Sequence, residues 1–142
     1  MSADNKMIVQ RSYDEIWKKG NLGTIPEFYA THVVDHNPLP GQAPGLAGLR
    51  ESFAMILGAF PDIRIDVDLL FAEDDLVVGR WTATGTHQGP MMGIPASGQP
   101  IKITGIDVQR IADGKIVEVW HQEDVLGMLQ QIGALPEPPP AR

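Results

Sequence analysis

The sequence of 142 residues predicts one α+β domain, in which helices pack on the concave face of a cone-shaped, curved antiparallel sheet. Three observations lead to this prediction. Apolar residues recur at helical spacing in the first part of the chain, residues 63–124 alternate with a period of two, and helical spacing returns at residues 125–132. Helices and strands grouped in this way are typical of α+β folds. We expect the domain to span residues 1–135 and the proline-rich residues 136–142 to form a disordered tail.

The elements of the first part follow from local signals. Apolar side chains fall on one side of residues 3–19, and Gly20 ends that helix. Thr24 and Pro26 suit the start of a short second helix at residues 24–30. A short strand at residues 32–38 ends at a proline, and a turn-rich loop leads to a third helix at residues 46–60.

The later elements form a predicted four-stranded meander and a closing helix. The strands are expected at residues 63–73, 76–87, 101–111 and 115–124, and the helix at 125–132. Asp113-Gly114, between the last two strands, is a strong signal for a hairpin with a two-residue turn. A curved sheet covered by helices on one face encloses a cavity, where ligands commonly bind.

Composition limits the classes of function. The net charge of −7 argues against a non-specific nucleic-acid partner, which needs a basic face. The chain has no cysteine, which excludes disulfides, a thiolate nucleophile and a zinc–thiolate site. No apolar run is long enough to cross a membrane, and the first residues lack the features of a secretory signal. We therefore expect a cytoplasmic protein without a membrane partner.

The last hairpin carries the candidate catalytic acids. With a two-residue turn, Asp107 pairs with Trp120, so that Asp107, Trp120, Gln122 and Asp124 share one face. We expect this face to form the cavity wall and His121 to lie on the opposite face; a longer turn would shift the assignment by one residue.

Burial raises the pKa of a carboxylic acid, which makes the group suitable for general acid/base catalysis. Asp107 could instead be a surface acid paired with a cation. Asp124 could be the N-cap of the last helix, a role compatible with catalysis.

Further candidates surround the predicted cavity. His36 and Asn37 are expected at its mouth, Trp81 and Trp120 as flat apolar walls, and His87 near the end of a long strand. The loop at residues 89–98 exposes apolar side chains, including Met92, and suits either a lid over the cavity or a dimer contact. The four histidines show no spacing typical of a metal site, so we expect no bound metal.

The other face of the hairpin predicts a homodimer. Ile106, Val108, Val117 and Val119 would form a second apolar surface that one layer of helices cannot cover.

Three stretches together resemble a known group of proteins: HNPLPGQAPGLAGL, FPDIRIDVDLLFAEDDLVVGRWTATGTHQGPMMGIPASGQPI and ITGIDVQRIADGKIVEVWHQEDVLGMLQQIG. They resemble the SnoaL-like polyketide cyclases and the related ester cyclase group of the nuclear-transport-factor-2-like (NTF2-like) superfamily. The resemblance implies the cone-shaped α+β fold and an intramolecular aldol condensation that uses no cofactor or metal. It also implies an acid/base aspartate near the end of the last strands, where Asp124 stands, with His121 as the competing position.

Related families share parts of this pattern. GIDVQRI resembles the ketosteroid isomerase strand whose aspartate helps to form an oxyanion hole, which would correspond to Asp107. The Asp-Pro pair that carries the isomerase base is replaced here by Asn37-Pro38, which disfavours steroid isomerisation. Limonene epoxide hydrolase shares the fold but uses an Asp-Arg-Asp set, and no arginine of this chain maps onto it convincingly.

The sequence thus predicts enolisation of a small hydrophobic carbonyl compound followed by ring closure. Asp124 would move the proton, and a neutral Asp107 would hydrogen-bond the enolate oxygen. His36, Asn37 and His87 would orient the substrate. The alternatives are an epoxide hydrolase-like enzyme of the same fold and a non-catalytic dimer that binds a small hydrophobic ligand.

Overall fold

A five-stranded curved sheet organises the computed structural model, which describes residues 2–136 and 139–140. The strand order is β1-β5-β4-β3-β2. Strands β2 to β5 form an antiparallel meander, and β1 pairs with β5 in parallel. The strands are β1 (Tyr29–Asp35), β2 (Arg64–Glu73), β3 (Leu76–Thr86), β4 (Pro100–Ala112) and β5 (Lys115–Glu123).

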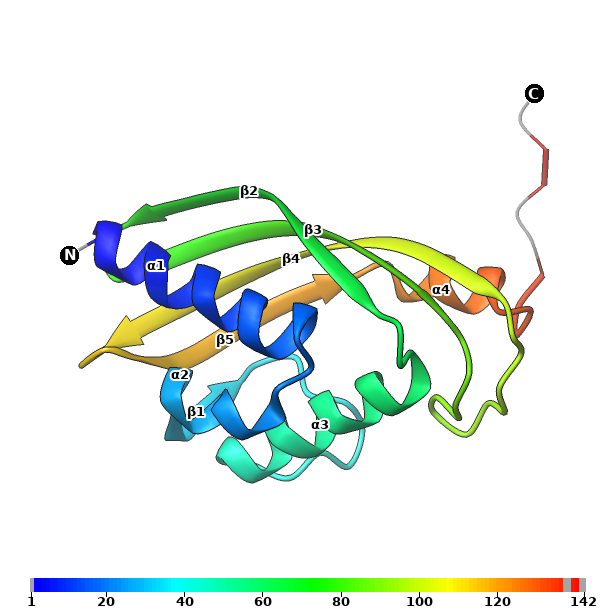
Figure 1. Ribbon diagram of the computed structural model, residues 1–142, viewed down its shortest axis with the longest axis horizontal. Coiled ribbons are helices and arrows are strands. Elements are labelled where there is room, and N and C mark those ends of the chain that lie inside the picture. The colour runs from blue at the N-terminus through cyan, green and yellow to red at the C-terminus, as the bar shows by residue number, and fades with distance from the viewer. Residues whose placement is uncertain (1, 137–138, 141–142) are drawn as a thin grey trace.

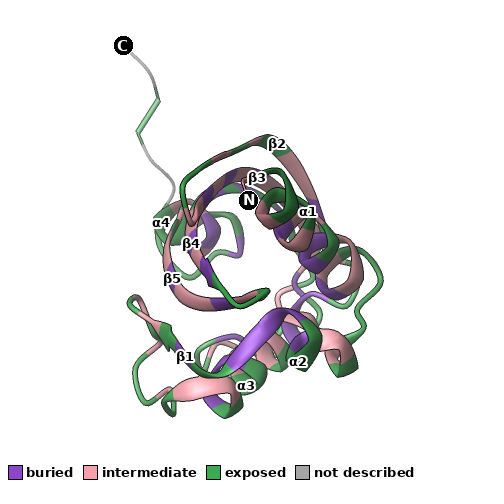
Figure 2. Ribbon diagram, turned by 90° about the vertical axis from the view of Figure 1, so that its left-hand side faces the viewer, coloured by how far each residue is buried: buried purple, intermediate pink, exposed green. Residues whose placement is uncertain are grey.

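The helices cover the concave side of this sheet. Helix α1 (Ser2–Ser12) runs across the strands and continues into a π-helical segment, Tyr13–Lys18. A 3₁₀ turn (Leu22–Thr24) and α2 (Ile25–Phe28) lead into β1; α3 (Gly45–Ala59) follows it, and α4 (Val125–Gln131) closes the chain. Figure 1 shows α1 and α3 on the same side of the sheet. Seen end-on in Figure 2, the sheet curls around an interior without closing. The predicted α+β cone is therefore confirmed.

The predicted elements agree with the observed ones, apart from shifts at their ends. The predicted strand at residues 32–38 begins earlier, at Tyr29, because α2 stops at Phe28. At the Asp113-Gly114 turn both residues have positive φ, 50° and 75°, as a type I′ hairpin turn requires. Of the predicted tail, residues 137–138 and 141–142 lie outside the described residues.

The predicted register of the last hairpin is wrong, because β5 contains a bulge. Pairing runs from Ala112–Lys115 to Ile111–Ile116 and then jumps to Arg110–Glu118, which leaves Val117 as an extra residue. An extra residue reverses the side-chain alternation of everything beyond it. Asp107 therefore pairs with His121, and Gly105 pairs with Glu123.

The bulge also divides the apolar face that predicted a dimer. Val119 turns inward and is 5% exposed, whereas Ile106 stays on the outer face at 48% exposure. The expectation that Ile106, Val108, Val117 and Val119 form one surface is therefore wrong. Leu69 and Phe71 of β2 are exposed instead, and both pair with residues of β3 whose side chains point outward.

Candidate functional site

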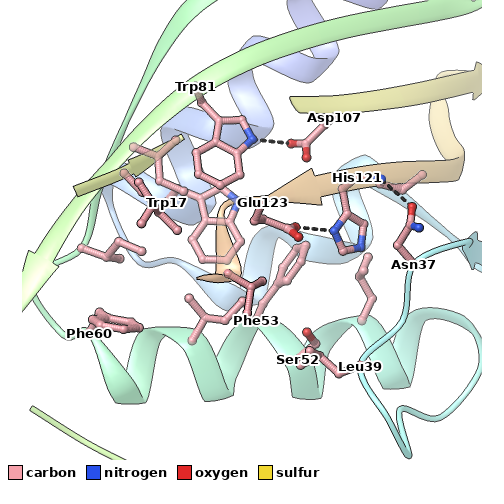
Figure 3. Close-up of a pocket in the computed structure, with 18 of the residues that line it drawn as sticks. Trp17, Asn37, Leu39, Ser52, Phe53, Phe60, Trp81, Asp107, His121 and Glu123 are labelled. Atoms are coloured by element: carbon pink, nitrogen blue, oxygen red, sulfur yellow. Dashed lines mark hydrogen bonds and ion pairs between the residues drawn. The ribbon is translucent and has the colours of Figure 1, made fainter. Parts of the chain in front are cut away.

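A cavity of about 190 Å³ lies between the concave face of the sheet and the helices. Its walls are mainly aromatic and aliphatic, and include Trp17, Phe53, Ile56, Phe60, Trp81 and Met91. Polar side chains gather on β4, β5 and the loop after β1, as Figure 3 shows for Asp107, His121, Glu123 and Asn37. An apolar pocket with a few convergent polar groups is the usual form of a small-molecule site.

The Asp107 carboxyl group faces this cavity from the middle of β4. Its Oδ2 accepts hydrogen bonds from the Tyr13 hydroxyl at 2.6 Å and from the Trp81 indole N–H at 3.1 Å. Burial raises the Asp107 pKa to about 6, although these two hydrogen bonds act in the opposite direction. A carboxyl group with this pKa can take up and release a proton near neutral pH.

Two glycines allow both donors to reach Asp107. A Cβ at Gly105 would lie 2.2 Å from a ring carbon of Trp81, so the indole can lie across β4 only because this residue has no side chain. A Cβ at Gly79, which pairs with Asp107, would lie 2.8 Å from the Tyr13 hydroxyl oxygen. Tyr13 itself begins the π-helical segment, a feature frequently found at functional sites.

His121 lies between two carboxylates. Its Nε2 is 2.8 Å from Asp35 Oδ1, and its Nδ1 contacts a carboxylate oxygen of Glu123. Burial alone would lower the His121 pKa, but the two carboxylates outweigh burial and raise the pKa to about 10. His121 is therefore an imidazolium at neutral pH. The Asp35 pKa is lowered, because hydrogen bonds from His121, Asn37 and Gln42 outweigh its burial.

Asn37 joins the loop after β1 to this cluster. Its side-chain Oδ1 accepts a hydrogen bond from the His121 backbone N–H at 2.8 Å, and its backbone N–H donates to Asp35 at 2.9 Å. The first of these bonds assigns the oxygen end of the amide. The Asn37 NH₂ group is left to donate to another acceptor at the cavity.

The structure brings five of the predicted site residues to the cavity. They are Asp107, His121, Asn37, Trp81 and Met92. His121 was expected on the opposite face, and the β5 bulge turns it inward. Met91 and Met92 of the predicted lid both line the cavity, whereas Ile94 bonds back to Met91 in a tight turn.

The same bulge places three other predicted residues outside. Trp120 stacks on His36 with a centroid distance of 4.7 Å, and Gln122 is exposed and pairs with outward-facing Ile106. Asp124 is exposed and caps α4, where it accepts the Gly127 N–H at 2.9 Å. The expectation that Asp124 points into the cavity is therefore wrong, and its alternative reading as an N-cap is confirmed.

The two other histidines among the predicted site residues also lie away from the cavity. His36 hydrogen-bonds Glu118 at 2.8 Å on the outer side. His87 is fully buried behind the wall, where its ring packs on Phe60 and its Nδ1 pairs with Ser97 at 2.9 Å. Neither is among the residues that line the cavity within the described chain.

Sequence reasoning missed several polar residues of the site, among them Tyr13, Asp35, Gln109 and Glu123. Tyr13 lies on the apolar side of the helix predicted for residues 3–19 and looks like an ordinary core residue. Gln109 shares the inward strand phase of Asp107 on β4, and Glu123 has the inward phase once Val117 is counted as a bulge. No local signal in the sequence marks that bulge, so only the strand pairing in the structure reveals it.

The described residues contain no group of three or more His, Cys, Asp or Glu side chains placed to hold a metal ion. Within the same part of the chain, no helix is both long enough and apolar enough to cross a membrane.

The sequence matches the SnoaL-like polyketide cyclase family over residues 7–132, and the protein belongs to this family. No curated protein matches the chain. Among solved structures, TsrD from Streptomyces laurentii is similar, with 28% identity and a TM-score of 0.85 over 94% of this chain and 97% of its own.

IdmH from Streptomyces antibioticus, for which a polyketide cyclase activity has been proposed, is 33% identical with a TM-score of 0.76. The similarity covers 91% of this chain and 98% of IdmH. A SnoaL-like protein from Jannaschia sp. CCS1 is 26% identical with a TM-score of 0.85, and the similarity covers 96% of each chain. The fold is thus that of the SnoaL-like and NTF2-like proteins, as the sequence predicted.

Proposed function

We propose that the protein catalyses cofactor-independent ring closure of a small hydrophobic compound that carries two carbonyl groups. A base removes a proton next to one carbonyl, and the resulting enolate carbon attacks the second carbonyl carbon of the same molecule. The observation that carries this proposal is the Asp107 carboxyl group, whose pKa of about 6 is set by burial in the wall of an apolar cavity.

Asp107 is the general base in this proposal. Its Oδ2 is held by Tyr13 and Trp81, and Oδ1 has no partner among the hydrogen bonds of the described residues. The proton therefore goes to Oδ1 and returns to the oxygen of the newly formed alkoxide. This role differs from the hydrogen-bond donor expected from sequence, and it replaces Asp124, which lies outside the cavity.

Asn37 and His121 support the developing negative charge. The Asn37 NH₂ group is oriented by the His121 backbone and can donate a hydrogen bond to the substrate carbonyl. The His121 imidazolium supplies a positive charge on the strand beside Asp107, with Asp35 and Glu123 fixing its orientation. Membership of the SnoaL-like polyketide cyclase family supports a reaction of this class.

A proton-exchange assay tests the base directly. 2-Tetralone has an acidic position next to its carbonyl and a size suited to the cavity. We expect the wild-type protein to accelerate its deuterium exchange in D₂O, followed by ¹H NMR, and Asp107→Asn to lose a hundredfold or more of that rate. Asp124→Asn is the matched control and should keep the rate. Loss of exchange in Asp124→Asn alone would assign the base to Asp124 and refute our choice.

The same assay separates the alternatives. A protein that binds 2-tetralone without exchanging its protons would be a small-ligand binder. Epoxide hydrolysis by an Asp-Arg-Asp set has less support, because no arginine is among the described residues that line the cavity.

A homodimer stays a prediction, and the structure changes the surface that would form it. Leu69, Phe71 and Ile106 lie on the outer face of the sheet, with exposures of 59%, 56% and 48%. We propose that a second copy covers this face. Sedimentation at micromolar concentration should give a dimer, and Phe71→Lys should give a monomer. If the wild-type protein sediments as a monomer, the proposal of a dimer is wrong.

A further inference from the structure

The Gln109 side chain carries an unpaired hydrogen-bond acceptor in the cavity wall. Gln109 lies two residues after Asp107 on β4 and faces the same side of the sheet. The residue is 3% exposed, and its Oε1 is buried without a hydrogen-bond partner among the described residues. Its strand neighbours, Val77 and Val119, are buried and apolar, so they offer no side-chain donor.

The Gln109 amide also has a polar neighbour within the protein. Tyr29 lies beside it, and burial raises the Tyr29 pKa while a hydrogen bond with Gln109 lowers it. Gln109 is also among the residues that line the cavity, so its unpaired oxygen lies in the cavity wall.

A buried carbonyl oxygen without a partner is unfavourable, and native proteins leave few of them. Such groups persist where a ligand completes them, and a site that hydrogen-bonds a ligand group strongly rejects analogues that lack this group. In this cavity the walls are otherwise mainly apolar. One unpaired acceptor can therefore determine which ligand binds and in which orientation it binds.

We propose that Gln109 is a specificity-determining residue whose Oε1 accepts a hydrogen bond from a hydroxyl group of the substrate. The inference rests on the proposed function and adds a substrate class to it: a hydroxylated, small hydrophobic carbonyl compound. Asp107, two residues away, faces the same cavity from the same strand. Gln109 thus fixes the hydroxyl end while Asp107 works on the carbon beside the carbonyl.

Three naphthalenes test this subsite by calorimetry, because they differ in one substituent. 2-Naphthol can donate a hydrogen bond, 2-methoxynaphthalene can only accept one, and 2-methylnaphthalene can do neither. We expect the wild-type protein to bind 2-naphthol about threefold to tenfold more tightly than the methyl compound. In Gln109→Met, which keeps an unbranched side chain, this ratio should fall to about one. Gln88→Met, at an exposed position, is the control and should keep the wild-type ratio.

A second measurement uses the ligand-free protein. If Gln109 Oε1 is unpaired there, Gln109→Met removes a buried, unsatisfied group, and the melting temperature should rise by about 2–6 °C. A lower melting temperature would mean that the amide is satisfied within the protein or by a bound water, and the proposal would be wrong. An unchanged ratio in Gln109→Met, or a preference for 2-methoxynaphthalene, would also overturn it.

The outcome is independent of the test of the base. Loss of hydroxyl discrimination in Gln109→Met with proton exchange of 2-tetralone intact supports both proposals. Discrimination that depends on Gln109 in a protein without proton exchange supports the subsite and refutes the reaction. Proton exchange that depends on Asp107, together with a binding ratio that does not change in Gln109→Met, supports the reaction and refutes the subsite.

Discussion

Asp107→Asn should make the protein more stable at neutral pH, although it removes the proposed base. Burial raises the Asp107 pKa from 3.8 to about 6, which means that folding disfavours the charged carboxylate. Because the folded-state pKa lies above the unfolded value, this group's stabilising contribution is complete below about pH 3.8. It is lost as the pH rises through 6. Asparagine has no proton to lose and can still accept hydrogen bonds from Tyr13 and Trp81.

The size of the gain follows from the two pKa values. A difference of about two pKa units corresponds to about 3 kcal/mol at pH 7, because each unit is worth about 1.4 kcal/mol. The same linkage gives only about 0.5 kcal/mol at pH 4. For a domain of this size the gain at pH 7 is a rise in melting temperature on the order of 10 °C.

Urea denaturation followed by tryptophan fluorescence measures this difference. The variant and the wild type should be compared at pH 7 and at pH 4, so that other titrating groups cancel. Glu51→Gln, which neutralises an exposed acid on α3, is the control and should show no comparable gain. The reasoning fails if Asp107→Asn is the less stable protein at pH 7. It also fails if the advantage is as large at pH 4 as at pH 7.

Three further predictions concern the residues around this carboxyl group. Gly105→Ala should displace the Trp81 indole, since its Cβ would lie 2.2 Å from the ring; the indole N–H resonance should shift as its bond to Asp107 is lost. Asp124→Ala should lower the free energy of unfolding by about 1 kcal/mol through loss of the α4 N-cap, with proton exchange of 2-tetralone unchanged. The raised His121 pKa means that its stabilising contribution is present below about pH 6.5 and is lost as the pH rises through about 10. The melting temperature should therefore fall over that range, and Asp35→Asn should weaken the fall; an equal fall in both proteins would contradict this.

The fold could be predicted from sequence because its signals are local. Helical spacing, period-two alternation and turn residues such as Asp113-Gly114 depend only on near neighbours along the chain. Their order is enough to indicate helices on one face of an antiparallel meander. The same local signals placed Asp107 on the cavity wall and gave Asp124 its alternative role as an N-cap.

The partners of Asp107 depend on the tertiary structure. Tyr13 reaches Asp107 from 94 positions away, and only the packing of α1 and the π-helical segment across the sheet brings the two together. The inward position of His121 depends on one extra residue in β5, Val117. Reading side chains alternately along a strand assumes unbroken pairing, so a single bulge reverses every later assignment. The sequence by itself thus determined the elements, their order and one of the acids. The tertiary structure decided which groups surround that acid, because register and long-range contacts are set by packing between strands and helices rather than by any one segment.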